Sequence, residues 1–178
     1  MENDKTNKVV AKEFYSKAEE RLHKYDFEGN NYKHLEEALL LFQSALEKDP
    51  SMIDAYVAIA NCKIRRRFTG DLDESAKIFE EVIKLQPENS SAHLGLGRCL
   101  HMKGDVESAI SEMEAAILYN PDFYTAHFDV ARLYVLKRNR KKAKEHLQLA
   151  TNSEFDQISS SAKELLEVID RELENTKK

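Results

Sequence analysis

Proline occurs only three times in the 178 residues of this chain, and each time it closes a similar phrase. The phrases are ALEKDP, VIKLQP and AILYNP, which end at Pro50, Pro87 and Pro121. The prolines are therefore 37 and 34 residues apart, and a recurrence of this length is typical of stacked structural repeats. Because proline lacks a backbone N–H and its ring clashes with the preceding helical turn, each phrase also predicts the end of a helix.

The clearest repeat unit lies at residues 90–123. In its first half, apolar residues recur every three or four positions, as on the buried face of a helix: Ala92, Leu96, Cys99 and Leu100. The second half repeats the pattern with Ala109, Met113, Ala116 and Ile117. Between them Gly104 and Asp105 interrupt the periodicity. The sequence therefore predicts two amphipathic helices joined by a tight turn.

This unit resembles the tetratricopeptide repeat, a helical hairpin of 34 residues. The following residues match the pattern of the family: His93, Leu96, Gly97, Leu100, Gly104, Ala109, Met113, Ala116 and Pro121. Three of them, His93, Leu100 and Met113, replace aromatic rings by other bulky side chains. Two further units, beginning at Ile53 and at Tyr124, match in the same register. The first of these has three extra residues around 65–70.

The resemblance implies an all-α fold, a right-handed superhelix of helical hairpins (an α-solenoid) that forms one domain overall. We expect a disordered N-terminus at 1–8, a degenerate repeat at 9–52, full repeats at 53–89, 90–123 and 124–157, and a C-terminal capping helix at 158–175. The degenerate repeat has a long turn at 26–31, and its first helix fits the pattern poorly. Ser161 and Glu164 have the spacing of a capping box at the start of the capping helix.

Composition sets limits on location and on ligands. The 27 Lys and Arg against 32 Asp and Glu give a net charge of -5, so no global attraction to nucleic acid is expected. The chain has no apolar run as long as a signal peptide or a membrane span requires, and we expect a cytoplasmic protein.

No group of residues indicates catalysis. The glycines of GLGRC lack the preceding strand and the third glycine of a nucleotide-binding loop. Cys62 and Cys99 have no paired ligands and are interpreted as reduced core thiols. Cys99 and His101 project to different sides of a helix, whereas His93 and His127 take equivalent repeat positions and should face the core. We therefore expect no enzyme, no metal and no cofactor.

In the family, the first helices of successive repeats line a concave groove. The positions that face it, carried over residue by residue, give these candidate binding residues: Val57, Asn61, Arg65, Leu94, Arg98, His101, Met102, Phe128, Asp129 and Arg132. Three of them, Val57, Leu94 and Phe128, form an apolar row across the repeats. This row could hold alternate side chains of an extended or helical peptide.

A polar row through Asn61, Arg98 and Arg132 runs beside it and could pair with carboxylates or carbonyls of the bound segment. The alternative is that the two arginines only solubilise the groove or pair with Asp129. Chaperone-binding members of the family clamp a C-terminal carboxylate with side chains at five groove positions, and only Asn61 matches them here. We therefore expect no recognition of heat-shock-protein tails.

A second surface is predicted at the turns between helices. We call it the basic edge, and it consists of Arg65, Arg66, Arg67, Lys103, Lys137, Arg138, Arg140, Lys141, Lys142 and Lys144. Such an edge could meet an anionic membrane, nucleic acid or an acidic partner segment, or it could simply be solvated. Nucleic acid is disfavoured because Phe68 is the only aromatic residue at these turns.

Together these features predict a non-catalytic protein–protein interaction module, such as an adaptor, a scaffold or a co-chaperone-like protein, that binds a peptide or helix in the groove. The alternative is a self-assembling scaffold, a homo-oligomer in which the loosely held N-terminal helix docks into a second copy. In that alternative, the basic edge could attach the assembly to an anionic membrane or organelle surface.

Overall fold

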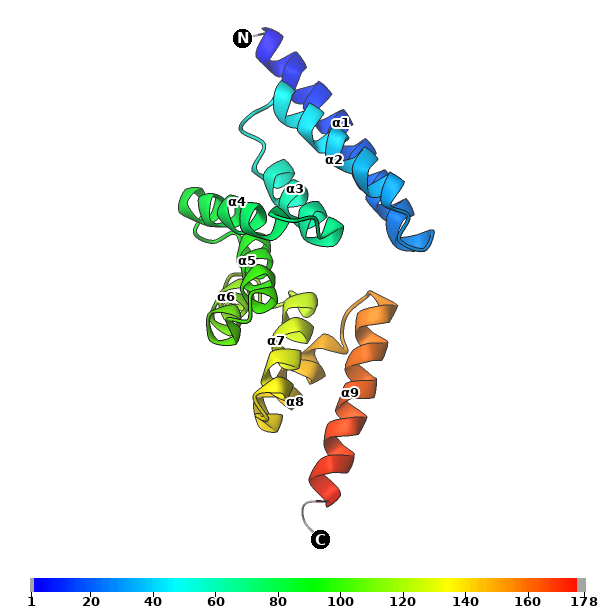
Figure 1. Cartoon of the computed structure of the whole chain (residues 1–178), viewed down its shortest axis with the longest axis vertical. Helices are drawn as coiled ribbons and strands as arrows, with labels where there is room; N and C mark the ends of the chain where they lie inside the picture. The colour runs from blue at the N-terminus through cyan, green and yellow to red at the C-terminus, as the bar shows by residue number, and fades with distance from the viewer. Residues whose placement is uncertain (1, 176–178) are drawn as a thin grey trace. The chain divides into compact units, whose positions relative to one another are not determined.

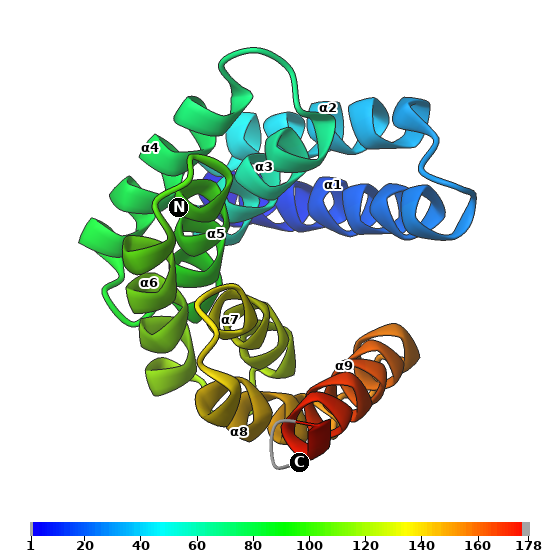
Figure 2. The ribbon, with the colours of Figure 1, turned by 60° about the horizontal axis from the view of Figure 1, so that its bottom comes forward.

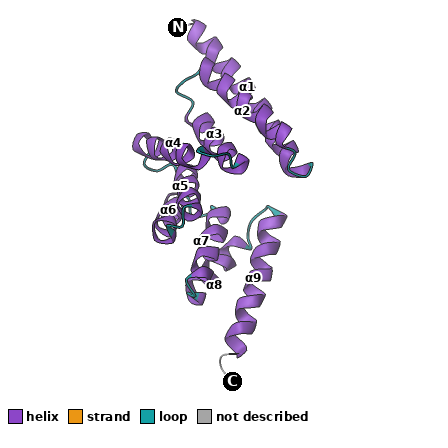
Figure 3. Ribbon diagram, viewed as in Figure 1, coloured by secondary structure: helices purple, strands orange, loops and turns teal. Residues whose placement is uncertain are grey.

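The computed structural model describes residues 2–175, and in this range every regular element is an α-helix (Figures 1 and 3). In chain order the helices are α1 (Glu2–Phe27), α2 (Tyr32–Lys48), α3 (Ile53–Arg66), α4 (Asp71–Leu85), α5 (Ser90–Met102), α6 (Val106–Tyr119), α7 (Tyr124–Leu136), α8 (Arg140–Ala150) and α9 (Asp156–Asn175). The predicted all-α class is confirmed. The chain divides into two compact units, Met1–Pro87 and Glu88–Lys178, which are described in turn.

The first unit is built on a long antiparallel pair, α1 and α2, which lie side by side in both views (Figures 1 and 2). Ala18 of α1 and Phe42 of α2 are buried in their shared core, together with Cys62 of α3. The rings of Tyr15 and Phe42 meet edge to face with their centroids 5.1 Å apart. The poorly fitting N-terminal helix is therefore packed against its neighbour rather than held loosely.

The N-terminal boundary differs from the sequence-based expectation. Residues 2–8 were expected to be disordered, but α1 begins at Glu2. Glycine and proline are absent before Gly29, so nothing interrupts the helix, and Lys8 lies 3.6 Å from Asp4 one turn earlier. At the other end Gly29 and Asn30 adopt positive φ, which confines the turn before α2 to a few residues.

The second unit contains the hairpins α5–α6 and α7–α8, whose apolar faces meet in one core. Gly97 allows α5 and α6 to approach closely. A Cβ at this position would lie 2.8 Å from Met113 Cγ and 3.1 Å from the carbonyl oxygen of Ala109. Gly104 turns the chain with a φ of 88°. The turn at Gly104 was expected from the sequence, and the structure confirms it.

In the second unit, side-chain caps set the starts of α5, α6 and α8. The predicted repeats at 53, 90 and 124 begin at the first residues of α3, α5 and α7. The side chain of Asn89 accepts a hydrogen bond from Ala92 N at 2.9 Å, and Asp105 accepts one from Ser108 N at 3.1 Å. Asn139 caps α8 in the same way through Lys142 N. These caps end each turn and fix where the next helix starts.

Helix α9 packs on α7 and α8 and buries Ala162 and Ile169 against their core. It begins at Asp156, two residues before the expected start, so the predicted capping box at Ser161 and Glu164 is wrong. The first turn is fixed instead by the preceding loop, because Ser159 Oγ donates a hydrogen bond to the carbonyl oxygen of Thr151 at 2.9 Å. A capping residue is therefore not needed where Ser161 stands.

Both thiols are buried, as predicted, and burial raises the pKa of Cys62 to about 12. Among the described helices, none combines the length and the apolar character that crossing a membrane requires.

Candidate binding surfaces

In the second unit, α5, α7 and α9 lie on one side and α6 and α8 on the other (Figure 2). Arg98 on α5 and Asp129 on α7 face each other. Arg98 Nε donates a hydrogen bond to Asp129 Oδ2 at 2.7 Å, and the two side chains are 36% and 15% exposed. The structure thus shows Arg98 paired with Asp129, which was the alternative to pairing with a bound segment.

Arg132 lies one turn further along α7 and remains exposed. Its guanidinium carbon is 5.9 Å from the centroid of the Phe128 ring, which is half-buried against the core. Within the described residues, no acidic side chain forms an ion pair with Arg132. At the end of α5, Met102 is exposed and His101 is half-buried. An apolar and cationic surface therefore remains open on α7.

Other predicted groove residues are less accessible than the pattern suggested. Leu94 is 3% exposed because it packs into the core of the second unit. In the first unit Val57 is also buried and Asn61 is half-buried. Arg65 donates from Nη1 to Asp26 Oδ1 at 2.8 Å and lies 6.0 Å from the Tyr25 ring centroid. This arginine therefore joins α3 to the end of α1.

The basic edge is largely matched by acidic side chains that the sequence spacing did not reveal. Its ion pairs are Arg65 with Asp26, Arg66 with Asp71 and Glu36, Lys137 with Glu107, Arg140 with Glu172, Lys142 with Glu114, and Lys144 with Asp170. Each exposed pair contributes little to stability, but together they offset the positive charge of the turns. Within the described chain, Arg67, Arg138 and Lys141 have no such acidic partner.

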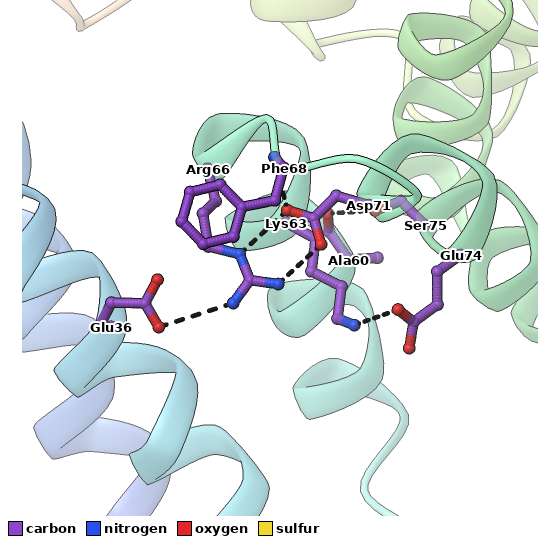
Figure 4. A network of polar contacts seen from close by, with 8 residues as sticks. All are labelled: Glu36, Ala60, Lys63, Arg66, Phe68, Asp71, Glu74 and Ser75. Atoms are coloured by element: carbon purple, nitrogen blue, oxygen red, sulfur yellow. Dashed lines mark hydrogen bonds and ion pairs between the residues drawn. The ribbon is translucent and has the colours of Figure 1, made fainter.

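A buried carboxylate organises the turn between α3 and α4 (Figure 4). Asp71 is 4% exposed and accepts hydrogen bonds from Arg66 Nε at 2.9 Å and Nη2 at 2.7 Å. It also accepts one from Phe68 N at 2.9 Å. The hydrogen bond with Arg66 holds the pKa of Asp71 below its ordinary value. The Arg66 guanidinium carbon in turn lies 4.7 Å from the Phe68 ring centroid.

Sequence reasoning missed this network, although its signals were present. Asp71 follows Arg66 by five residues, directly after the three extra residues of the turn. Ser75, which replaces the usual alanine of the family, donates a hydrogen bond from Oγ to the carbonyl oxygen of Ala60 at 3.0 Å. A polar residue at a core position was therefore the visible sign of a polar contact within the hairpin.

Two histidines at equivalent repeat positions are buried, as predicted, but they have different partners. His93 Nδ1 is 2.7 Å from Glu112 Oε2, whereas His127 Nδ1 is 2.9 Å from His146 Nδ1. His127 Nε2 lies 2.9 Å from the carbonyl oxygen of Pro121, which can only accept, so this nitrogen carries the proton. Burial, followed by the neighbouring His127, lowers the pKa of His146. No cluster of three metal-ligating residues occurs in the described range.

These features define a class of protein: successive antiparallel helical hairpins with small residues at close helix contacts and an amphipathic helix at the end. The family model described as tetratricopeptide repeat matches residues 69–122. Within residues 69–122 the chain thus matches the tetratricopeptide repeat, the family that its repeat pattern resembles.

Curated relatives match only part of their own length. The human "antiviral innate immune response effector IFIT1" is 27% identical over 142 residues, which cover 68% of this chain and 28% of the relative. The mouse "interferon-induced protein with tetratricopeptide repeats 2" is 27% identical over 121 residues, covering 67% of this chain and 20% of the relative. The chain thus spans less than a third of the length of these relatives.

Solved structures share the fold at low sequence identity. The thermophilic tetratricopeptide-repeat protein TTC0263 of Thermus thermophilus aligns with a TM-score of 0.66 at 18% identity, over 96% of this chain and 82% of that one. The Yersinia enterocolitica type III secretion chaperone SycD, in complex with a peptide of the translocator YopD, gives 0.61 at 22% identity, over 67% and 93%. PcrH, in complex with the chaperone-binding region of PopD, gives 0.62 at 18% identity, over 70% and 95%.

Proposed function

We propose that this chain is a non-catalytic protein-interaction module that binds a peptide or helical segment of another protein. The observation that carries the proposal is on α7, where the exposed side chain of Arg132 lies beside the half-buried ring of Phe128. An aromatic surface beside an unpaired guanidinium can take an apolar side chain and a carboxylate or carbonyl of the same segment.

The neighbouring contacts support this arrangement. Because Arg98 is held by Asp129, it fixes the spacing of α5 and α7 rather than serving a ligand. Arg132 is then the cation available to a partner, and Met102 adds exposed apolar surface on α5. Ordering a flexible segment offsets much of its contact energy, so we expect micromolar affinity, about 8 kcal/mol of binding free energy.

The structural likenesses give independent support for this class of function. Two of the proteins that share the fold, SycD and PcrH, have structures in complex with segments of the proteins YopD and PopD. Their identities to this chain are 22% and 18%, so the likeness extends to the fold and not to the bound sequence.

The proposal is tested by affinity capture from a lysate, with bound proteins identified by mass spectrometry. We would compare the wild type with Phe128→Ala and Arg132→Glu, and use Lys141→Glu as a matched charge reversal on α8. Partners of the α7 surface should be retained by Lys141→Glu and lost with both α7 variants. If all variants of unchanged helicity capture the same proteins, this surface is not the binding site.

The self-assembling scaffold has less support. In that alternative α1 would dock into a second copy, yet Ala18 and Tyr25 of α1 are already buried against α2 and α3. Exchange between copies would first have to separate this core. Light scattering over a concentration series should therefore give a constant mass, whereas a mass that rises steadily with concentration would favour the scaffold.

A further inference from the structure

The last helical turn of α3 is followed by a strained residue. Arg67 adopts the left-handed conformation with a φ of 58°, and Arg138 does so after α7 with a φ of 56°. The corresponding turn after α5 has Gly104, with a φ of 88°. Glycine adopts this conformation without steric cost, whereas arginine does not. Arg67 therefore occupies a position where glycine would be more stable.

Arg67 lines a pocket that lies wholly within the first unit. Its volume is about 510 Å³, and its walls come from the start of α2 and the α3–α4 turn: Tyr32, Lys33, Glu36, Arg66, Arg67 and Phe68. We call it the α2–α3 pocket. Both walls depart from the repeat pattern, since one belongs to the degenerate repeat and the other contains the three extra residues.

Two aromatic rings on this pocket are exposed to solvent. Phe68 is 59% exposed and Tyr32 is 53% exposed, which is unusual for large apolar side chains that share one site. The Phe68 ring does not need a ligand to be held in place. Arg66 lies beneath it and is fixed by its paired hydrogen bonds to Asp71 (Figure 4). One wall is thus preorganised for an apolar group.

The charges at the rim favour an anionic ligand. Glu36 is the only carboxylate among the described lining residues, and it lies 3.6 Å from Arg66. Arg67 has no acidic partner among the described residues, and the 76% exposed side chain of Lys33 reaches Glu37 only at 3.9 Å. The α2–α3 pocket therefore combines aromatic rings with available cations.

We propose that the α2–α3 pocket binds a short acidic segment of a partner protein that carries an aromatic side chain beside its carboxylates. The partner's ring packs against Phe68 and Tyr32, and its carboxylates pair with Arg67 and Lys33. A nucleic acid or an anionic membrane fits less well, because both require many cations and this rim offers two. The inference is independent of the α7 surface proposed above.

The test is a nuclear magnetic resonance titration of the full chain with two end-blocked probe peptides. One has the sequence glutamate-phenylalanine-glutamate-glutamate, and in the other lysines replace the glutamates. The acidic peptide should shift the backbone amides of Lys33, Arg67 and Phe68 saturably. The proposal is overturned by no saturable shift up to about 5 mM acidic peptide, or by equal shifts with the lysine peptide. Tighter binding of a single-stranded RNA or of phosphatidylserine vesicles at these amides would also overturn it.

The chain offers a matched pair of variants for this test. Arg67→Gly and Arg138→Gly remove the same charge and relieve the same left-handed backbone, but only Arg67 lines the α2–α3 pocket. We expect Arg67→Gly and Phe68→Ala each to weaken binding of the acidic peptide at least about fivefold, and Arg138→Gly to leave it unchanged. Arg132→Glu should also leave it unchanged, which separates this site from the α7 surface. Equal affinity of Arg67→Gly and wild type would refute the proposal.

Discussion

At the scale of single residues, a buried carboxylate of the first unit holds a charged partner in place. Asp71 is buried and neutralises Arg66, whose side chain is 20% exposed. Removing one partner of such a pair leaves the other charge poorly solvated, which costs more than the pair itself contributes.

We predict that Asp71→Asn lowers the free energy of unfolding by about 2–3 kcal/mol, because the amide cannot neutralise Arg66. Urea denaturation would measure the loss. Glu80→Gln removes an exposed carboxylate from the same helix and should change stability by less than about 0.5 kcal/mol. Equal effects of the two substitutions would show that the Arg66 contact is energetically unimportant.

Gly97 supports a second prediction at this scale. Gly97→Ala should destabilise the chain by about 1–3 kcal/mol, because the new methyl group would overlap Met113 Cγ. In a Met113→Ala background, the cost of Gly97→Ala should fall by about 1 kcal/mol or more, since the overlapping side chain is gone. Thermal or urea unfolding of the four chains completes the cycle. If Gly97→Ala costs the same in both backgrounds, the cost comes instead from the contact with the carbonyl oxygen of Ala109.

Whether the role of such a residue could be predicted from sequence depends on how far along the chain its partners lie. Gly97 was predictable because its role depends on helical periodicity and on a recurring repeat position. Asp71 was not, because its partner is set by the path of three extra residues. The acidic partners of the basic edge were missed for a similar reason: Lys144 and Asp170 are 26 residues apart in sequence, and only the packing of α9 on α8 brings them together.

At the scale of elements, the hairpins α5–α6 and α7–α8 differ in one equivalent contact. The first joins a histidine to a glutamate, through His93 and Glu112, and the second joins two histidines, His127 and His146. Added protons weaken a contact between two histidines, because two imidazolium groups repel each other.

We predict that α7–α8 loses more stability than α5–α6 between pH 7 and pH 5. The pKa of His146 is lowered from 6.5 in the folded chain by burial and by His127. Lys142 adds to this effect, while Glu114 and Glu145 oppose it. The unfolded chain therefore binds protons first, so stability is full above pH 6.5 and declines as the pH falls through the folded pKa.

Hydrogen exchange corrected for the intrinsic pH effect would measure this difference between the hairpins. His146→Glu recreates the contact of the first hairpin and should remove the acid sensitivity of α7–α8. If the variant and the wild type lose protection equally at pH 5, the histidine pair is not the cause.

Element boundaries were predictable where capping residues and glycines lie at repeat positions, as at Ser90 and Val106. They were not predictable at the two ends of the chain. Helix α1 continues to Glu2 because no residue stops it, and α9 begins at Asp156 because loop contacts replace a capping side chain. Periodicity identifies the middle of a helix better than its terminal turns.

At the scale of the whole molecule, the sequence predicted the fold class correctly because the proline spacing and the repeat pattern agree over most of the chain. The positive charge of the basic edge was overestimated from the sequence. Counting lysines and arginines along the sequence ignores the carboxylates that pack against them. The net charge of -5 then dominates at a distance.

We therefore predict that the chain does not co-sediment with phosphatidylserine vesicles at about 150 mM salt, where the screening length is about 8 Å. Wild type and Lys141→Glu, Lys142→Glu should both remain in the supernatant. Salt-sensitive co-sedimentation of the wild type alone would contradict this expectation and restore the basic edge as a membrane site.

The two buried thiols have a practical consequence. Cys62 belongs to the first unit and Cys99 to the second, and both side chains are fully shielded from solvent. An alkylating reagent reacts with an accessible thiolate, so at neutral pH each cysteine is labelled only when its own surroundings open. The natural sequence thus contains one internal reporter for each unit. The ratio of their labelling rates, read by mass spectrometry, would reveal whether the two halves of the chain open together or separately.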